Sequence, residues 1–200
     1  MKKLIISLLT VILFSTTASA VTYRGFVDAG VGIISGNNVS SDLELSFSTT
    51  HGVQINRHFF VGAGISYLYG YEMFYDAENS HRIANSMSLA PYLALRYDVD
   101  IAKRWSPFIE CRIGKNVFSS LDYDYDISNA EFSTLFINPR IGVRLKISSR
   151  CAFNFAISYI PYNIDVTYTE QYWSSNSWNT ITGDKNLKLS NISFNLGFDF

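Results

Sequence analysis

Ile192-Ser193-Phe194-Asn195-Leu196-Gly197-Phe198-Asp199-Phe200 ends the chain, and in this stretch large apolar residues alternate with small or polar ones. Successive side chains of a β-strand point to opposite faces, so the alternation places all the large apolar residues on one face. A strand with one wholly apolar face is typical of a strand that lies against lipid. We therefore predict a membrane-spanning strand at this end of the chain.

Seven earlier segments show the same alternation, and all are too short to cross a membrane as helices. They lie at about residues 22–34, 43–56, 59–71, 85–98, 105–118, 135–147 and 151–162. Short connections alternate with long ones, and the long ones lie at about 35–42, 72–84, 119–134 and 163–185. This pattern is typical of membrane barrels with short turns at one end and long loops at the other. The sequence thus predicts an all-β protein, an eight-stranded antiparallel up-and-down transmembrane β-barrel.

The polar face of these strands decides whether the barrel is a membrane protein or a soluble barrel with an apolar interior. That face is rich in Gly, Ser, Ala and Asn and also carries charges of both signs. An Arg or Lys facing lipid at mid-bilayer costs about 2–4 kcal/mol, so the charged face is expected to line the lumen. We predict a lumen charge network of Asp28, Arg96, Glu110, Arg112, Arg140 and Arg144.

Glu110 is expected to meet Arg140 or Arg112, because the strands that carry these residues are neighbours in sequence. Such charges could form an ion path or a structural plug. The plug is favoured, because eight strands enclose a space that side chains can fill.

The other end of the chain predicts export. A basic start at Lys2 and Lys3 precedes an apolar run from Leu4 to Phe14, and Ala18-Ser19-Ala20 has the small residues of a signal-peptide cleavage site. A membrane anchor would need an apolar run of about 20 residues. We predict a cleavable signal peptide at 1–20, a barrel domain at 21–200, and both termini in the periplasm.

Composition and cysteine use agree with this class. Aromatic and charged residues each make up 16% of the chain, whereas ordinary soluble domains have about 25% charged residues. The formal net charge is −1 and there is no basic run, so nucleic acid is not expected as a partner. Cys111 and Cys151 fall on predicted strands with another strand between them, about two spacings of 4.8 Å apart, so we expect no disulfide.

Catalytic signals are weak. His51 falls on the apolar face of its strand unless a bulge at Thr49-Thr50 turns it inward, and His58 lies in a turn. Ser80-His81 lies in an external loop, but a nucleophile also needs a base within reach and a third orienting group. No metal-ligand spacing or phosphate-binding loop is present, and the acidic run 122–126 favours a solvated loop over a weak calcium site. We predict no cofactor, no metal and no catalytic residue.

The chain resembles a known family in the alternating residues at its end, in the regular spacing of its predicted hairpins and in segments such as Ser106-Pro107-Phe108-Ile109-Glu110. This family comprises the small eight-stranded outer-membrane barrels of Gram-negative bacteria: the barrel of outer membrane protein A, outer membrane protein X and the porin-like barrels of Bacteroidetes. The resemblance implies contact with outer-membrane lipid and lipopolysaccharide. It also implies an assembly signal for the barrel-assembly machinery, with Phe200 as its principal residue and Phe194, Leu196 and Phe198 in support.

The predicted function is that of a non-catalytic integral outer-membrane protein with a plugged polar lumen. Its long external loops would serve surface interaction or membrane integrity. Tyr172, Trp173 and Trp178 are the candidate recognition residues for an extracellular ligand or a host surface, because exposed aromatic residues often anchor interfaces. Three alternatives remain: an outer-membrane enzyme of the lipid A deacylase or acyltransferase type, a narrow porin-like channel, and a soluble periplasmic ligand-binding barrel.

Overall fold

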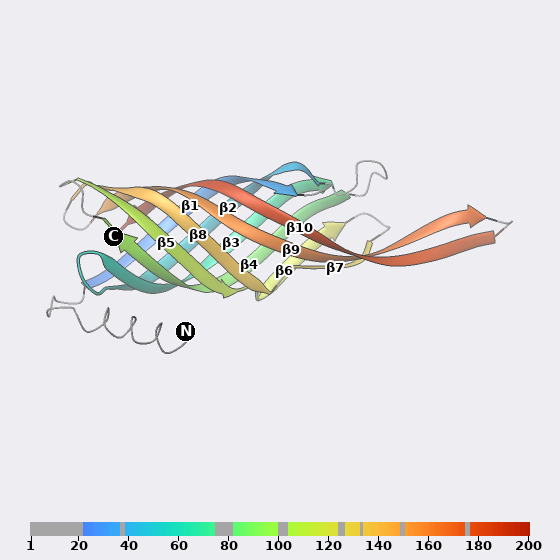
Figure 1. Cartoon of the computed structure of the whole chain (residues 1–200), viewed down its shortest axis with the longest axis horizontal. Helices are drawn as coiled ribbons and strands as arrows, with labels where there is room; N and C mark the ends of the chain where they lie inside the picture. The colour runs from blue at the N-terminus through green and yellow to red at the C-terminus, as the bar shows by residue number, and fades with distance from the viewer. Residues whose placement is uncertain are drawn as a thin grey trace, which may run out of the picture.

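The computed structural model describes residues 22–36, 39–74, 82–99, 104–123, 127–132, 134–148, 151–174 and 177–200. The described strands form one antiparallel sheet (Figure 1). They are β1 (Thr22–Gly36), β2 (Val39–Gln54), β3 (Phe59–Phe74), β4 (Arg82–Asp98), β5 (Trp105–Lys115), β6 (Phe118–Tyr123), β7 (Ile127–Phe132), β8 (Leu135–Lys146), β9 (Ala152–Ser174) and β10 (Ser177–Asp199).

The sheet closes on itself, because β1 pairs with β2 on one side and with β10 on the other. The seam between β1 and β10 runs from Phe26 opposite Asp199 to Gly36 opposite Leu189. Strand β6 pairs with β4 beyond the end of β5, and β7 pairs with β9 beyond the start of β8. These two short strands therefore extend the positions of β5 and β8 in the wall. The fold is the predicted closed eight-stranded barrel.

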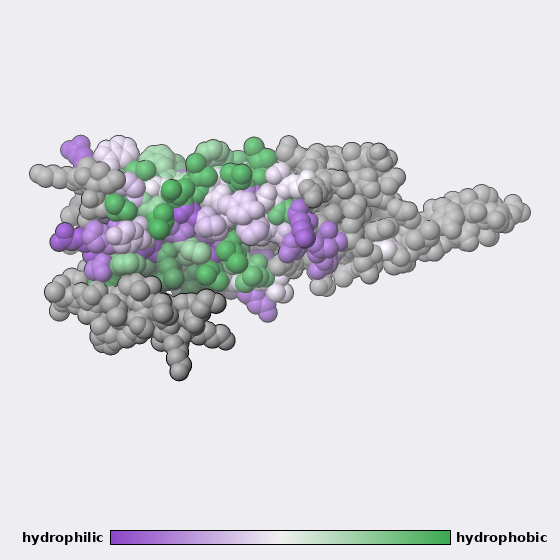
Figure 2. Space-filling model, in the orientation of Figure 1, coloured by the Kyte–Doolittle hydropathy of each residue, from purple (hydrophilic) through white to green (hydrophobic). Residues whose placement is uncertain are grey.

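The two faces of the wall point as the alternation predicts. Leu93 and Phe194 are 66% and 64% exposed on the outside, whereas Arg112 and Arg140 are 2% and 5% exposed inside. Figure 2 shows apolar residues gathered over the middle of the coloured surface, with hydrophilic residues on both sides of them, at the left end and beside the grey atoms on the right. A soluble barrel with an apolar interior would have the opposite arrangement.

The prediction of a long loop at 163–185 is wrong. Strands β9 and β10 run through it as a continuous hairpin, paired from Asp199 opposite Ala152 to Ser177 opposite Ser174. This hairpin projects beyond the rest of the barrel (Figure 1), and we call its outer part, residues 163–174 and 177–188, the ribbon. Ile164, Val166 and Tyr168 alternate with polar residues at the start of this stretch, but from position 169 onwards polar and apolar residues mix on both faces, so no sustained apolar face indicates strands. The β-branched and aromatic residues of the stretch nevertheless favour extended structure.

The other predicted long loops are also partly strand. Most of 119–134 belongs to β6 and β7, and most of 35–42 belongs to β1 and β2. In the predicted loop 72–84, β3 continues to Phe74 and β4 begins at Arg82, while 75–81 lie outside the described residues. Alternation identified the membrane-crossing parts of the strands but not their extensions into water.

Cys111 and Cys151 are both free, as predicted. Cys111 lies on β5 and Cys151 immediately precedes β9, with β8 between these strands. Within the described ranges, no helix is both long enough and apolar enough to cross a membrane. The predicted signal peptide lies outside the described residues and stays a prediction.

Candidate functional site: the filled lumen, the seam and the ribbon

We use two names for the ends of the barrel. The terminal end is where β1 begins and β10 finishes, and the ribbon end is where the ribbon projects. At the terminal end, Arg24 bridges two acids, with Nη1 2.6 Å from Asp98 and Nη2 2.6 Å from Asp199. Arg144 also contacts Asp199, at 2.6 Å, and Arg96 contacts Asp98 at 2.9 Å. Five charged side chains from four strands thus close this end of the lumen with ion pairs.

A second group of charges lies deeper in the lumen. Arg112 contacts Asp28 at 2.6 Å and Glu110 at 2.5 Å, and Arg140 contacts the same two acids at 3.1 Å and 3.0 Å. Each arginine is therefore ion-paired with both acids, and a buried charge needs such a partner. Arg96 Nη1 lies 3.7 Å from Glu110 and links this group to the one at the terminal end.

The arginines are also packed against aromatic rings. The guanidinium of Arg96 lies 3.6 Å from the centre of the Phe108 ring, and that of Arg112 lies 4.9 Å from the centre of the Tyr92 ring. Arg24 lies 5.5 Å from the centre of the Phe26 ring. A guanidinium over a ring face is a favourable cation–π contact. The rings fill the volume that the charges leave, so this half of the lumen is packed rather than open.

Towards the ribbon end the lumen contents become less charged. Tyr92 and Thr50 share a hydroxyl hydrogen bond of 2.7 Å, and Ser158 and Ser193 share one of 2.6 Å. Beyond them, buried apolar side chains form a plug; they are Ile34, Leu68, Ile160 and Leu189. Glu44 lies buried against this plug, with Tyr162 as a hydrogen-bond donor.

The structure brings all six predicted lumen residues into one connected network, and Glu110 contacts both of its candidate partners. Arg24, Asp98 and Asp199 belong to the same network. All three alternate onto the polar face of their strands, so parity also assigns them to the paired charges of the lumen. The sequence could not predict the contact between Arg24 and Asp98, because these residues lie on strands that are not neighbours in the wall.

An aromatic cluster covers the seam on the outer wall at the terminal end. The backbone of Phe200 exchanges two hydrogen bonds of 2.9 Å with Gly25. His51 lies on the outer face without a bulge at Thr49-Thr50, since β1 and β2 stay in register there. Its ring stacks with Tyr23 and meets Phe200 edge-on.

His51 and His58 are the two histidines among the described residues, and each has hydrogen-bond partners. The Tyr23 hydroxyl is 2.6 Å from His51 Nδ1, and Thr49 Oγ1 is 3.0 Å from its Nε2, so both ring nitrogens already have partners. His58 Nδ1 lies 2.9 Å from the backbone oxygen of Asp98. Ser80 and His81 lie outside the described residues.

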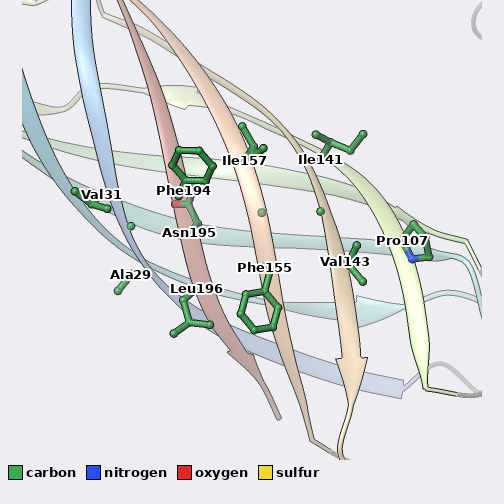
Figure 3. Close-up of a pocket in the computed structure, with 13 residues that line it drawn as sticks. Ala29, Val31, Pro107, Ile141, Val143, Phe155, Ile157, Phe194, Asn195 and Leu196 are labelled. Carbon is green, nitrogen blue, oxygen red and sulfur yellow. The ribbon is translucent and has the colours of Figure 1, made fainter. Parts of the chain in front are cut away.

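A groove of about 740 Å³ runs over the outer wall across β10, β9 and β8 (Figure 3). Its labelled side chains are mostly aliphatic or aromatic, including Phe155, Ile141 and Phe194. The groove has almost no polar groups to orient a reacting substrate, so its chemistry suits contact with acyl chains.

The candidate recognition residues belong to the ribbon rather than to a loop. Trp173 pairs opposite Trp178 across the hairpin, and Tyr172 pairs opposite Asn179. Their side chains lie outside those described. The hairpin register therefore brings the two tryptophan positions together, although they are separated in sequence.

A closed barrel with an apolar outer belt and a charged, packed lumen is an outer-membrane β-barrel protein. The family model described as "Outer membrane protein beta-barrel domain" matches residues 6–200, and the chain belongs to this family. A search of curated proteins finds no match.

Solved structures agree on the fold. The outer membrane protein OprG from Pseudomonas aeruginosa is similar with a TM-score of 0.56 at 12% identity, over 88% of this chain and 94% of OprG. Neisserial surface protein A (NspA) is similar with a TM-score of 0.54 at 16% identity, over 90% of this chain and 98% of NspA. At these identities the likeness concerns the fold alone.

Proposed function

We propose that this protein is a non-catalytic outer-membrane barrel that contacts partners outside the cell through its ribbon. The observation that supports this most is the length of the β9–β10 hairpin. The seam with β1 ends at Leu189, whereas β10 begins at Ser177. The ribbon thus continues well past the barrel wall.

The edges of the ribbon support a role in contact. Among the described residues, β10 pairs only with β9 from Ser177 to Lys188, and β9 pairs with β7 only from Ile164 to Tyr168. The outer part of the ribbon therefore presents backbone N–H and C=O groups that no neighbouring strand uses. Such edges can accept an extended segment of another chain as an added strand.

The filled lumen supports a plug rather than a channel. Paired charges and rings occupy the terminal half, and apolar side chains occupy the ribbon end. An ion crossing this path would have to displace buried arginine–carboxylate pairs. We therefore propose that the barrel wall and its plug serve as an anchor for the ribbon.

The orientation and assembly of the barrel belong to the same proposal. Both termini lie in the periplasm, the ribbon faces outside, and Phe200 is the principal residue read by the barrel-assembly machinery. Phe200 is well suited to this role because its ring lies exposed at the seam, where the last strand closes onto the first. Lipopolysaccharide and outer-membrane lipid surround the apolar belt.

Removal of the ribbon tests the proposal. Residues 167–184 are replaced by a short turn, and cells that display either form are allowed to adhere to a panel of immobilised matrix proteins and glycans. We expect the shortened form to insert and fold normally but to lose adherence about tenfold. Equal adherence of the two forms would refute a contact role for the ribbon.

Enzymatic activity has a separate test. Purified barrel is incubated with lipid A, and released fatty acids are measured for the wild type and for Ser80→Ala and His81→Ala variants. We expect no release above the level without protein. Release that both substitutions abolish would establish the enzyme alternative instead.

A further inference from the structure

One buried acid of the lumen differs from all the others. The buried carboxylates of the described residues are Asp28, Glu44, Asp98, Glu110 and Asp199. Four of them contact at least one arginine within ion-pair distance. Glu44 contacts no cation among the described residues, although it is only 4% exposed.

Among the described residues, the Glu44 carboxylate accepts hydrogen bonds from neutral donors only. The Tyr162 hydroxyl donates to Oε2 at 2.6 Å, and the Asn191 side-chain amide donates to Oε1. These bonds satisfy lone pairs but supply no positive charge. A buried carboxylate without a countercharge is strongly unfavourable, and the apolar plug beside it makes the surroundings less able to screen that charge.

A small cavity lies next to this carboxylate. Its volume is about 10 Å³, and its walls combine oxygen-bearing and apolar side chains. The lining residues are Ile34, Glu44, Leu68, Ser86, Ser88, Tyr162 and Leu189. A space of this volume is about the minimum for one water-sized particle.

The hydroxyl groups at the cavity have oxygen lone pairs to offer. Ser88 donates its proton to Asn116 Oδ1 at 3.0 Å, and Tyr162 donates its proton to Glu44. Because the Ser88 proton points to Asn116, lone pairs of the Ser88 oxygen can face a positive ligand. The cavity thus combines a carboxyl group that has no cationic partner among the described residues with the hydroxyl oxygens of two serines.

We propose that this cavity binds a single monovalent cation of about the size of sodium. Glu44 supplies the charge, and the hydroxyl oxygens of Ser86 and Ser88 are further ligands. One positive charge neutralises one carboxylate, whereas a divalent ion would leave a net buried charge. Divalent sites generally use several carboxylates or histidines, and the described residues contain no such cluster of three.

The bound cation would connect separate parts of the wall. Glu44 lies on β2, the two serines lie on β4, and Tyr162 lies on β9. Binding would hold these strands around the apolar plug. By mass action, a ligand that binds only the folded state raises stability as its concentration rises.

The test uses the full mature chain folded in detergent micelles. The midpoint of thermal unfolding, followed by the change in gel mobility, is measured at equal ionic strength in sodium, potassium and choline chloride. We expect the midpoint to rise with sodium concentration and to remain constant in choline. The Glu44→Gln variant, which retains the shape but not the charge, is expected to lose this sodium dependence.

Matched variants make the result specific. Asp165→Asn removes an equivalent charge from an exposed ribbon position and is expected to keep the sodium dependence. If Glu44→Gln does not fold, Ser86→Ala with Ser88→Ala keeps the carboxylate, and about tenfold more sodium is expected for the same shift. Equal wild-type midpoints in sodium and choline would overturn the proposal, as would undiminished sodium dependence in the serine double variant.

Discussion

At the scale of single residues, the lumen is organised around acids that each serve more than one arginine. Asp28 illustrates this arrangement, because Arg112 and Arg140 both donate to it. Buried ion pairs add little net stability compared with a well-packed apolar core, but loss of one partner leaves the other charge uncompensated. Loss of a single charged residue is therefore expected to lower stability by more than the small net stability that the ion pairs contribute.

This sensitivity gives a first prediction. Asp28→Asn leaves Arg112 and Arg140 to share Glu110, so the free energy of unfolding is expected to fall by about 3–5 kcal/mol. Urea unfolding in lipid vesicles measures the change. The exposed Asp165→Asn variant is the control and is expected to stay within about 0.5 kcal/mol of the wild type. A similarly small change at Asp28 would contradict the role given to the network.

A second residue-scale prediction concerns the seam. A Cβ at Gly25 would lie 2.8 Å from the Phe200 ring, closer than carbon atoms can approach. Gly25→Val is therefore expected to push the Phe200 ring out of the aromatic cluster and to reduce the yield of folded barrel. Gel mobility without heating measures this yield. Ala29→Val, also outward-facing and exposed on β1, should fold as well as the wild type; equal yields from both variants would refute the seam interpretation.

At the scale of elements, the β9–β10 hairpin differs from the rest of the wall. Its inner part alternates apolar and polar residues, because one face meets lipid and the other the lumen. Its outer part, the ribbon, keeps this alternation only at 163–168, where β7 also pairs with β9; farther out, β9 and β10 pair only with each other among the described residues. The two parts thus occupy different solvents although they belong to the same strands.

A third prediction tests the direction in which the ribbon faces. In a background without Cys111 and Cys151, single cysteines replace Asp165 in the ribbon or Arg57 in the turn between β2 and β3; both positions are exposed. A membrane-impermeant maleimide added to intact cells is expected to label position 165 and not position 57. Permeabilised outer membranes should expose both positions. Labelling of position 57 alone in intact cells would reverse the proposed orientation.

At the scale of the whole molecule, the barrel combines an apolar outside with an interior that its own side chains fill. The charge network closes the terminal half, and the plug of Ile34, Leu68, Ile160 and Leu189 closes the ribbon end. An eight-stranded barrel has little room beyond this, since its lumen is only about as wide as packed side chains need. This arrangement supports the proposed anchoring role over a transport role.

A fourth prediction follows for conductance. Purified wild-type barrel reconstituted into planar bilayers is expected to produce no stepwise current, because no continuous aqueous path crosses both closed layers. A general porin added to the same bilayer confirms that insertion can be detected. Regular steps from the barrel itself would favour the narrow-channel alternative.

The sequence determined the strand periodicity, the outward belt and the inward polar face. These features depend on side chains two positions apart in one strand, and such spacing is local. For the same reason, the six predicted lumen residues could be selected by parity alone. The pairing of Glu110 with Arg140 was also predicted, because the segments that carry them are consecutive among the predicted strands, and the two residues lie directly opposite each other.

Only the tertiary structure decided which groups meet across the lumen. Asp28 on β1 reaches Arg112 on β5, and Arg24 on β1 reaches Asp98 on β4, because closure of the wall brings distant strands face to face. Closure likewise placed no arginine of the described residues within ion-pair distance of Glu44. The ribbon also emerged only in three dimensions, since most of it is held by backbone pairing between its two strands rather than by a sustained apolar face that a sequence pattern could reveal.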